Sequence, residues 1–360
     1  MPTEPQVRFY LGANSPAGFY SLYDELIDPL EAKSIFILKG GAGCGKSTFM
    51  RQVARQAEEK GLPVEYIPCS GDPDSLDAVI LPGQKSAIVD GTAPHVVEPR
   101  YPGVVERYVN LGDCYDYKAL AGKREGVVAA MTGYKGCYAQ AYRCLSAAEE
   151  VTKNLRSVLE TPEMREKMGK RARGILKREV RRREGGTGRV TRRFLSAVTH
   201  KGPLCEYGTV EKLCKRVYEL DDPWGLAHGL LCPLLRGAVA AGWDAIACPS
   251  PMEPGRLEHL LLPQLSLGFV TSGPQLRWDR HAYRRLHLDA MADREVLKRE
   301  RGRLRFGRKI VQALQEEAVA SLAQAKEMHD KLEGIYNPFV DFGSVRRLAD
   351  QAAAELLGPV

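Results

Sequence analysis

Residues 40–48 carry the side chains and glycines that binding of phosphate requires. They read Gly-Gly-Ala-Gly-Cys-Gly-Lys-Ser-Thr and fit the pattern G-x-x-x-x-G-K-[ST], in which loop amides face an anion. The lysine of such a loop reaches the β and γ phosphates, and the next hydroxyl holds Mg²⁺. We predict Lys46 as a catalytic cation and Ser47 as a metal ligand. The predicted nucleotide-binding residues are Gly40, Gly41, Ala42, Gly43, Cys44, Gly45, Lys46, Ser47 and Thr48.

Asp90 ends an apolar stretch, Ser-Ala-Ile-Val-Asp, that predicts a buried strand. The carboxyl ends of strands in open α/β sheets face the ligand crevice, so we predict that Asp90 holds Mg²⁺ and takes part in catalysis. An aspartate that only forms a turn is the alternative. Gly91 follows, where many ATP motors carry a glutamate that activates water. This argues against a fast mechanical ATPase.

Three further polar residues lie near these segments. His95, in Gly-Thr-Ala-Pro-His, is a candidate for proton transfer or contact with the γ-phosphate, although most loop histidines have no such role. Asp72 and Asp74 could contact substrate or Mg²⁺, and an Asp-Pro turn that caps a short helix before Leu76 is an equal alternative. The remaining histidines show no metal-ligand spacing.

The elements that would position the loop alternate between strand and helix. Residues 34–38 form a continuous apolar strand, and residues 46–60 a helix that ends at Gly61. Residues 63–67 and 86–90 predict further strands. This alternation predicts βαβ units and a parallel sheet.

Beyond Tyr101 the pattern becomes helical through Glu160, and residues 311–336 repeat that helix. We interpret these two stretches as arms of a coiled-coil hairpin that are structural or bind a partner.

The chain contains two weakly similar copies. Three blocks recur in the same order at spacings near 180 residues, which predicts an internal duplication. The matched positions are Arg8, Leu11, Ala13 and Gly18 with Arg192, Leu195, Ala197 and Gly202; Pro68, Pro73, Leu76, Leu81, Pro82 and Val89 with Pro249, Pro254, Leu257, Leu262, Pro263 and Val270; and Leu145, Ala148, Glu150 and Leu155 with Leu322, Ala325, Glu327 and Leu332.

We predict an α/β protein with a nucleotide-binding module at residues 1–162, a basic linker at 163–190 and a degenerate module at 191–360. The second loop falls within residues 221–229, which contain no lysine, and Thr271 stands in the place of Asp90. This copy is therefore expected to be a scaffold or regulatory half that does not bind nucleotide.

Composition fits an ordinary globular protein. Of 360 residues, 44% are hydrophobic and 27% charged, and no apolar run reaches the roughly 18 residues that span a bilayer. The first ten residues lack the apolar block of a secretory signal. Nine cysteines without a CxxC pair indicate reduced thiols. We expect a cytoplasmic protein without membrane segments.

Positive charge is concentrated in two segments. Residues 165–193 hold 13 basic and 3 acidic side chains, and residues 277–309 hold 12 and 5. Such segments can bind nucleic acid or another acidic partner, and solvated helix faces are the alternative. The first segment lacks aromatic residues on which unpaired bases could stack.

Three strings carry a resemblance to a known family: FILKGGAGCGKST, CSGDPDSLDAVILP and IVDGTAPH. With the opening RFYLGANSPAGFYSLYDEL, they resemble an uncharacterised bacterial family of duplicated P-loop ATPases, over nearly the whole chain. The resemblance implies a P-loop fold in each copy and the handling of ATP. Many members have a P-loop in both halves, whereas this sequence keeps only the first.

Two functions remain open. The first is an enzyme in which Mg-ATP binds the first copy and is hydrolysed or donates its phosphoryl group. The second is a slow nucleotide-responsive switch whose basic segments hold a partner.

Overall fold

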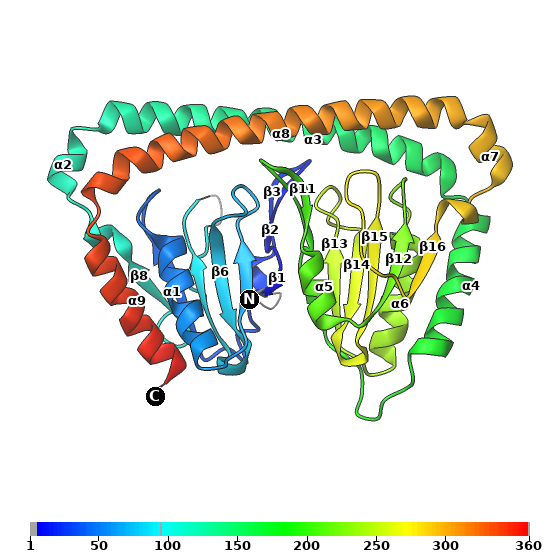
Figure 1. Ribbon diagram of the computed structural model, residues 1–360, viewed down its shortest axis with the longest axis horizontal. Helices are drawn as coiled ribbons and strands as arrows, with labels where there is room; N and C mark the ends of the chain where they lie inside the picture. The colour runs from blue at the N-terminus through cyan, green and yellow to red at the C-terminus, as the bar shows by residue number, and fades with distance from the viewer. Residues whose placement is uncertain (1–5, 94–95, 359–360) are drawn as a thin grey trace. The chain divides into compact units, whose positions relative to one another are not determined.

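The computed structural model describes residues 6–93 and 96–358. The chain forms two compact units that interleave along the sequence (Figure 1). Among the described residues, the first unit contains 6–13, 21–141 and 320–358, and the second contains 14–20 and 142–319. The compact units differ from the modules predicted from the sequence. Those ranges, 1–162, 163–190 and 191–360, mark the two copies and the linker between them along the chain.

The first unit is built on a six-stranded sheet in the order β1-β5-β6-β7-β4-β8. Buried apolar runs such as Ile35–Leu38 explain why the central strands form there, since both of their faces are covered. The strands are β1 (Val7–Arg8), β4 (Ser34–Lys39), β5 (Glu65–Pro68), β6 (Leu76–Leu81), β7 (Ser86–Asp90) and β8 (Glu106–Asn110).

The prediction of a wholly parallel sheet is wrong for β6. This strand runs antiparallel to both β5 and β7, and the remaining pairs are parallel. The reason is the short connection between β6 and β7, which consists of the 3-10 turn η2 (Pro82–Gln84) and Lys85, because four residues are too few for the crossover that parallel strands need. The sheet is therefore mixed.

Helices cover this sheet. α1 (Lys46–Glu59) buries an apolar stripe and packs on β6 and on α9 (Phe342–Leu357). Gly61, with φ of 71°, follows its end in the conformation that glycine favours. The long helices α3 (Arg124–Leu159) and α8 (Arg301–Tyr336) contribute residues 124–141 and 320–336 to this unit.

The expected continuous helix from Tyr101 to Glu160 is wrong in its first part. β8, the 3-10 turn η3 (Leu111–Cys114) and the short α2 (Tyr117–Ala121) precede α3. β8 is an edge strand with most of its side chains outside the core, so no strong apolar pattern marks it.

The second unit has a sheet with the same order of equivalent strands, β9-β13-β14-β15-β12-β16. β14 again runs antiparallel to both neighbours, and the other pairs are parallel. The strands are β9 (Val190–Arg192), β12 (Arg216–Asp221), β13 (Ala245–Pro249), β14 (Leu257–Leu262), β15 (Leu267–Ser272) and β16 (Arg284–His287).

Local geometry repeats in the same places. Lys85 and Ser266, with φ of 51° and 48°, follow equivalent 3-10 turns, and they are the two non-glycine residues with positive φ in the described part of the chain. Gly18 and Gly202 both have φ of 101° in the hairpins β2–β3 (Gly12–Ser15, Gly18–Ser21) and β10–β11 (Ser196–Thr199, Gly202–Cys205). The architecture is thus compatible with the predicted duplication.

The basic segment expected as a linker is mostly helix. α4 (Pro162–Glu179) buries an apolar stripe against α6 (His228–Ala240), and its basic side chains lie on the exposed face. The buried residues of that stripe are Met164, Met168, Ala172 and Ile175. This unit also contains α5 (Tyr207–Leu213), α7 (Arg294–Arg299), and residues 142–159 of α3 and 301–319 of α8.

The packing of α4 and α9 explains why the units interleave. α4 follows α3, the long helix of the first copy, but packs against α6 in the second unit. α9 follows α8, the long helix of the second copy, but packs against α1 in the first unit.

Across residues 6–93 and 96–358, none of the helices is both long and apolar enough to span a membrane.

Candidate functional site

The loop at residues 40–45 joins β4 to α1 in the first unit and turns on glycines with positive φ. Gly43 and Gly45 have φ of 67° and 87°, values that side chains disfavour. A Cβ atom on Gly43 would lie 2.5 Å from the Asn337 side-chain amide, and one on Gly40 would lie 2.6 Å from Cys44 Sγ. Glycine is therefore required for this close packing.

Lys46 folds back over the loop. Its Nζ donates hydrogen bonds to the carbonyl oxygens of Gly40 and Gly41 at 2.9 and 2.8 Å, and lies 3.6 Å from Asp90 Oδ2. The two charged side chains are only 13% and 12% exposed. The structure thus brings together Lys46 and Asp90, which the sequence placed in one site.

Ser47 and Asp90 are both held in place by hydrogen bonds. Ser47 Oγ accepts from the amide of Leu76 at 3.1 Å. Asp90 Oδ1 accepts from the amide and hydroxyl of Thr92 at 2.8 and 2.6 Å, which leaves Oδ2 toward Lys46. A serine hydroxyl and a carboxylate are oxygen ligands suited to a hard divalent cation.

These groups line a cavity of about 680 Å³, a size typical of ligand sites. Residues 40–48 and Asp90 form one side. Side chains of the long helices form another, among them Tyr134 and Tyr138 of α3 and Lys326 and His329 of α8.

A second lysine faces this cavity and was missed in the sequence. Lys326 Nζ lies 3.1 Å from Asp72 Oδ2. Burial acts to raise the pKa of Asp72, but the hydrogen bond from Ser75 and the Lys326 ammonium lower it below its usual value. Asp72 is therefore a lining carboxylate with a cationic partner. No local pattern marks Lys326, because it lies far along the chain from the loop.

The other sequence candidates differ in their positions. Asp74 is exposed and does not line the cavity, while its backbone carbonyl accepts a hydrogen bond from Arg51. His95 lies outside the described residues. The expected short helix before Leu76 is a turn, closed by a hydrogen bond from the Ser75 amide to the Asp72 carbonyl at 2.8 Å.

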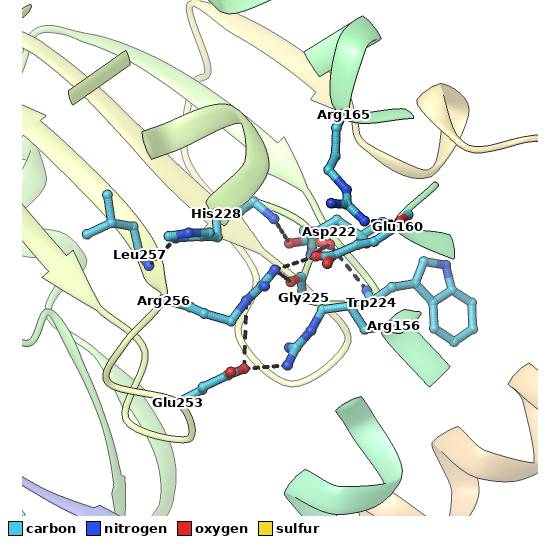
Figure 2. Close-up of polar contacts among 12 residues, drawn as sticks. Arg156, Glu160, Arg165, Asp222, Trp224, Gly225, His228, Glu253, Arg256 and Leu257 are labelled. Carbon is cyan, nitrogen blue, oxygen red and sulfur yellow. Dashed lines mark hydrogen bonds and ion pairs between the residues drawn. The ribbon is translucent and has the colours of Figure 1, made fainter. Parts of the chain in front are cut away.

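In the corresponding loop of the second unit, residues 222–227, backbone amides donate hydrogen bonds to the side chain of Asp222. Asp222 accepts hydrogen bonds from the amides of Trp224, Leu226 and Ala227 at 3.3, 2.9 and 2.7 Å (Figure 2). Asp222 is 6% exposed. Three amides of the loop that leads into α6 therefore already donate to a side chain of the same loop.

Alignment of α1 with α6 identifies the residue of the second unit that corresponds to Lys46. Their buried positions have the same order and spacing, which pairs Ala227 with Lys46 and His228 with Ser47. The aligned residues are Phe49, Met50, Val53 and Ala57 of α1 with Leu230, Leu231, Leu234 and Ala238 of α6.

Two further contacts support this alignment. His228 Nδ1 accepts from the Leu257 amide at 3.0 Å, as Ser47 Oγ accepts from the Leu76 amide. Thr271 pairs with Leu220 in its sheet, as Asp90 pairs with Leu38. The second loop therefore has neither the lysine nor the strand-end aspartate.

Comparison of the chain with protein-family models, with curated proteins and with solved structures gives no match.

An ion-pair cluster lies beside the second loop (Figure 2). Arg156 pairs with Glu149 at 3.2 Å and with Glu253, and Arg256 pairs with Glu160 at 2.5 Å. Arg256 also donates to the carbonyl of Gly225 at 3.1 Å. Burial raises the pKa of Glu149 from 4.5 to about 7, the Arg156 guanidinium acts to lower it, and the Glu253 carboxylate to raise it.

This shift predicts that stability depends on pH through Glu149. Between pH 4.5 and 7 the folded chain keeps a proton that the unfolded chain releases, so the free energy of unfolding falls as pH rises, by up to about 3 kcal/mol. Glu149→Gln should flatten this part of the profile in urea unfolding followed from pH 4 to 8. Glu150→Gln, at an exposed neighbour, should keep it. An unchanged slope in Glu149→Gln would contradict the assignment.

Proposed function

We propose that the first unit is a Mg-dependent ATP-binding P-loop NTPase that hydrolyses ATP or transfers its phosphoryl group. One observation carries the proposal: the ammonium group of Lys46 lies between two loop carbonyls and Asp90 at the side of a cavity large enough for a nucleotide. A helix N-terminus beside a lysine is a favourable place for a polyphosphate.

Each residue has a distinct part in this proposal. The loop amides and Lys46 bind the phosphates, with Lys46 exchanging its carbonyl partners for phosphate oxygens. Ser47 and Asp90 would hold Mg²⁺, which supplies positive charge to the phosphates when bound. Lys326 is a candidate for a further phosphate contact, because it lines the same cavity. His95 stays a candidate from the sequence alone.

A nucleotide-responsive switch is the second candidate. Gly91, rather than a glutamate, follows Asp90. Side chains of α3 and α8 line the cavity, so a bound nucleotide would contact both long helices. ATP would then act by changing how these helices pack rather than by rapid turnover.

Phosphate release under single-turnover conditions separates the two candidates. For the enzyme, we expect release that requires Mg²⁺ and falls at least tenfold in Asp90→Asn, because a metal ligand is lost. Asp113→Asn, at an exposed aspartate outside the cavity, is the matched control. Tight ATP binding with release at the level of buffer alone would reject the enzyme and favour the switch.

The glycine geometry gives a further prediction. Gly43→Ala should weaken Mg-ATP binding at least tenfold, because its Cβ would collide with Asn337 and meet the Glu333 backbone at 3.1 Å. Gly61→Ala has a similar φ of 71° with nothing within 4 Å of the new Cβ. It should cost about 1 kcal/mol of stability without changing affinity. If calorimetry gave the same Mg-ATP affinity for Gly43→Ala and Gly61→Ala, residues 40–45 would not be the phosphate-binding loop.

A cytoplasmic setting and an acidic partner belong to the same proposal. All nine cysteines are free, which fits a reducing compartment. The exposed basic face of α4 and the basic residues within 277–309 could hold nucleic acid or another acidic partner. Retention on nucleic acid that does not weaken as salt rises would exclude this use of the basic segments.

A further inference from the structure

The second unit contains its own cavity, of about 440 Å³, beside the loop at residues 222–227. The walls come from this loop, from residues 250–258 and 271–276, and from parts of α3 and α8. Equivalent segments line the cavity of the first unit. The volume is in the range of small-molecule sites.

The floor of this cavity does not suit a polyphosphate. The carboxylate of Asp222 already accepts the loop amides, and a second anion there would be repelled at close range (Figure 2). Arg156 and Arg256 beside it are paired with carboxylates. An incoming anion must therefore find its partners elsewhere in the cavity.

Free positive charge is concentrated on the wall formed by α8. Arg305, Arg308 and Lys309 line the cavity and are exposed. Within the described part of the chain, none of the three lies within ion-pair distance of a carboxylate. Three unpaired cations on one wall attract a small anion, and arginine pairs well with carboxylate and phosphate groups.

The same region offers an aromatic and apolar surface. The Arg308 guanidinium carbon lies 5.0 Å from the centroid of the Trp224 ring. The Trp224 side chain extends away from the cluster around Asp222 (Figure 2). Leu276 and Val311 also line the cavity. The amide side chains of Gln275 and Gln315, joined by a hydrogen bond of 2.6 Å, add donors and acceptors that can contact polar ring edges.

We propose that this cavity binds a small organic anion that carries a flat ring, with the ring against Trp224 and the anionic group at Arg305, Arg308 and Lys309. A nucleoside monophosphate and an aromatic carboxylate share this chemistry. The site goes beyond the proposed function, because it lies within the second unit and uses none of the residues of the first loop.

The test is a fluorescence and calorimetric titration of the full-length chain carrying Lys46→Ala, so that the first loop does not take up the probe. The probes are AMP, GMP, 4-hydroxybenzoate, adenosine and inorganic phosphate. We expect at least one ring-bearing anion to bind and to change tryptophan emission. Adenosine and phosphate alone should bind at least tenfold more weakly, because each lacks one half of the recognised chemistry.

Variants in the same background locate the site. Arg305→Gln combined with Arg308→Gln should weaken binding at least tenfold, and Trp224→Phe should remove the emission change. Arg301→Gln, on the same helix but outside the cavity lining, should bind as the parent does. Circular dichroism melting identifies any variant that fails to fold. The proposal is overturned if no ring-bearing anion binds at millimolar concentration, or if the double variant binds as tightly as Arg301→Gln.

Discussion

Replacement of Lys46 by alanine is expected to weaken Mg-ATP binding at least 100-fold. The lysine Nζ lies within 2.9 Å of two loop carbonyls and 3.6 Å from Asp90, so its removal takes away the positive charge that lies at the loop itself. Loss of charge-assisted hydrogen bonds to phosphate costs about 1.5–3 kcal/mol each. The remaining Asp90 carboxylate would then repel the phosphates. Isothermal titration with a slowly hydrolysed ATP analogue measures the effect.

Two controls make the Lys46 result specific. Lys33→Ala removes an exposed lysine near the start of β4 and should leave affinity unchanged. Lys46→Arg keeps the charge but brings a larger planar group into a closely packed loop, so we expect affinity to fall there too. If Lys46→Ala bound ATP within threefold of the parent, the loop would not be the nucleotide site.

The second large effect concerns stability. Asp222→Ala should lower the free energy of unfolding by at least about 3 kcal/mol, because three backbone amides in and near the core lose their acceptor. The second unit should be the part affected. Urea unfolding followed by tryptophan emission is informative, because all three tryptophans, Trp224, Trp243 and Trp278, lie in that unit.

The matched variants for Asp222 separate charge from hydrogen bonding. Asp222→Asn retains an acceptor oxygen and should lose less stability than the alanine variant. Asp279→Ala, at a side chain that is 78% exposed, should change stability by less than about 0.5 kcal/mol. A loss in Asp222→Ala no larger than that in Asp279→Ala would contradict the view that this carboxylate holds the loop.

Much of the fold near the loop was predictable, because strong local signals determine it. The apolar run of β4 and the apolar strand ending at Asp90 are at or close to their predicted bounds. α1 also begins at the predicted residue, Lys46, directly after Gly45. Three strands of this sheet, β1, β6 and β8, were missed. β6 is buried at all six positions, but Asp77 interrupts its apolar run, and β8 is a mostly exposed edge strand.

The candidate site was predictable only where its residues follow adjacent strands. Lys46 and Asp90 meet because β4 and β7 are neighbouring parallel strands, with Leu38 paired to Asp90. The pairing of Lys326 with Asp72 depends instead on how α8 packs in the first unit. The hydrogen bonds from the loop amides to Asp222 were also not predictable from local sequence, because they depend on the three-dimensional conformation of the loop.

The most direct test of the central claim is calorimetric titration of the unmodified, folded chain with ATP, with and without Mg²⁺. We expect one tight site per chain that requires Mg²⁺, because the first loop contains Lys46 and the amides of the second loop already bind Asp222. Failure to bind any purine triphosphate in the presence of Mg²⁺ would contradict it.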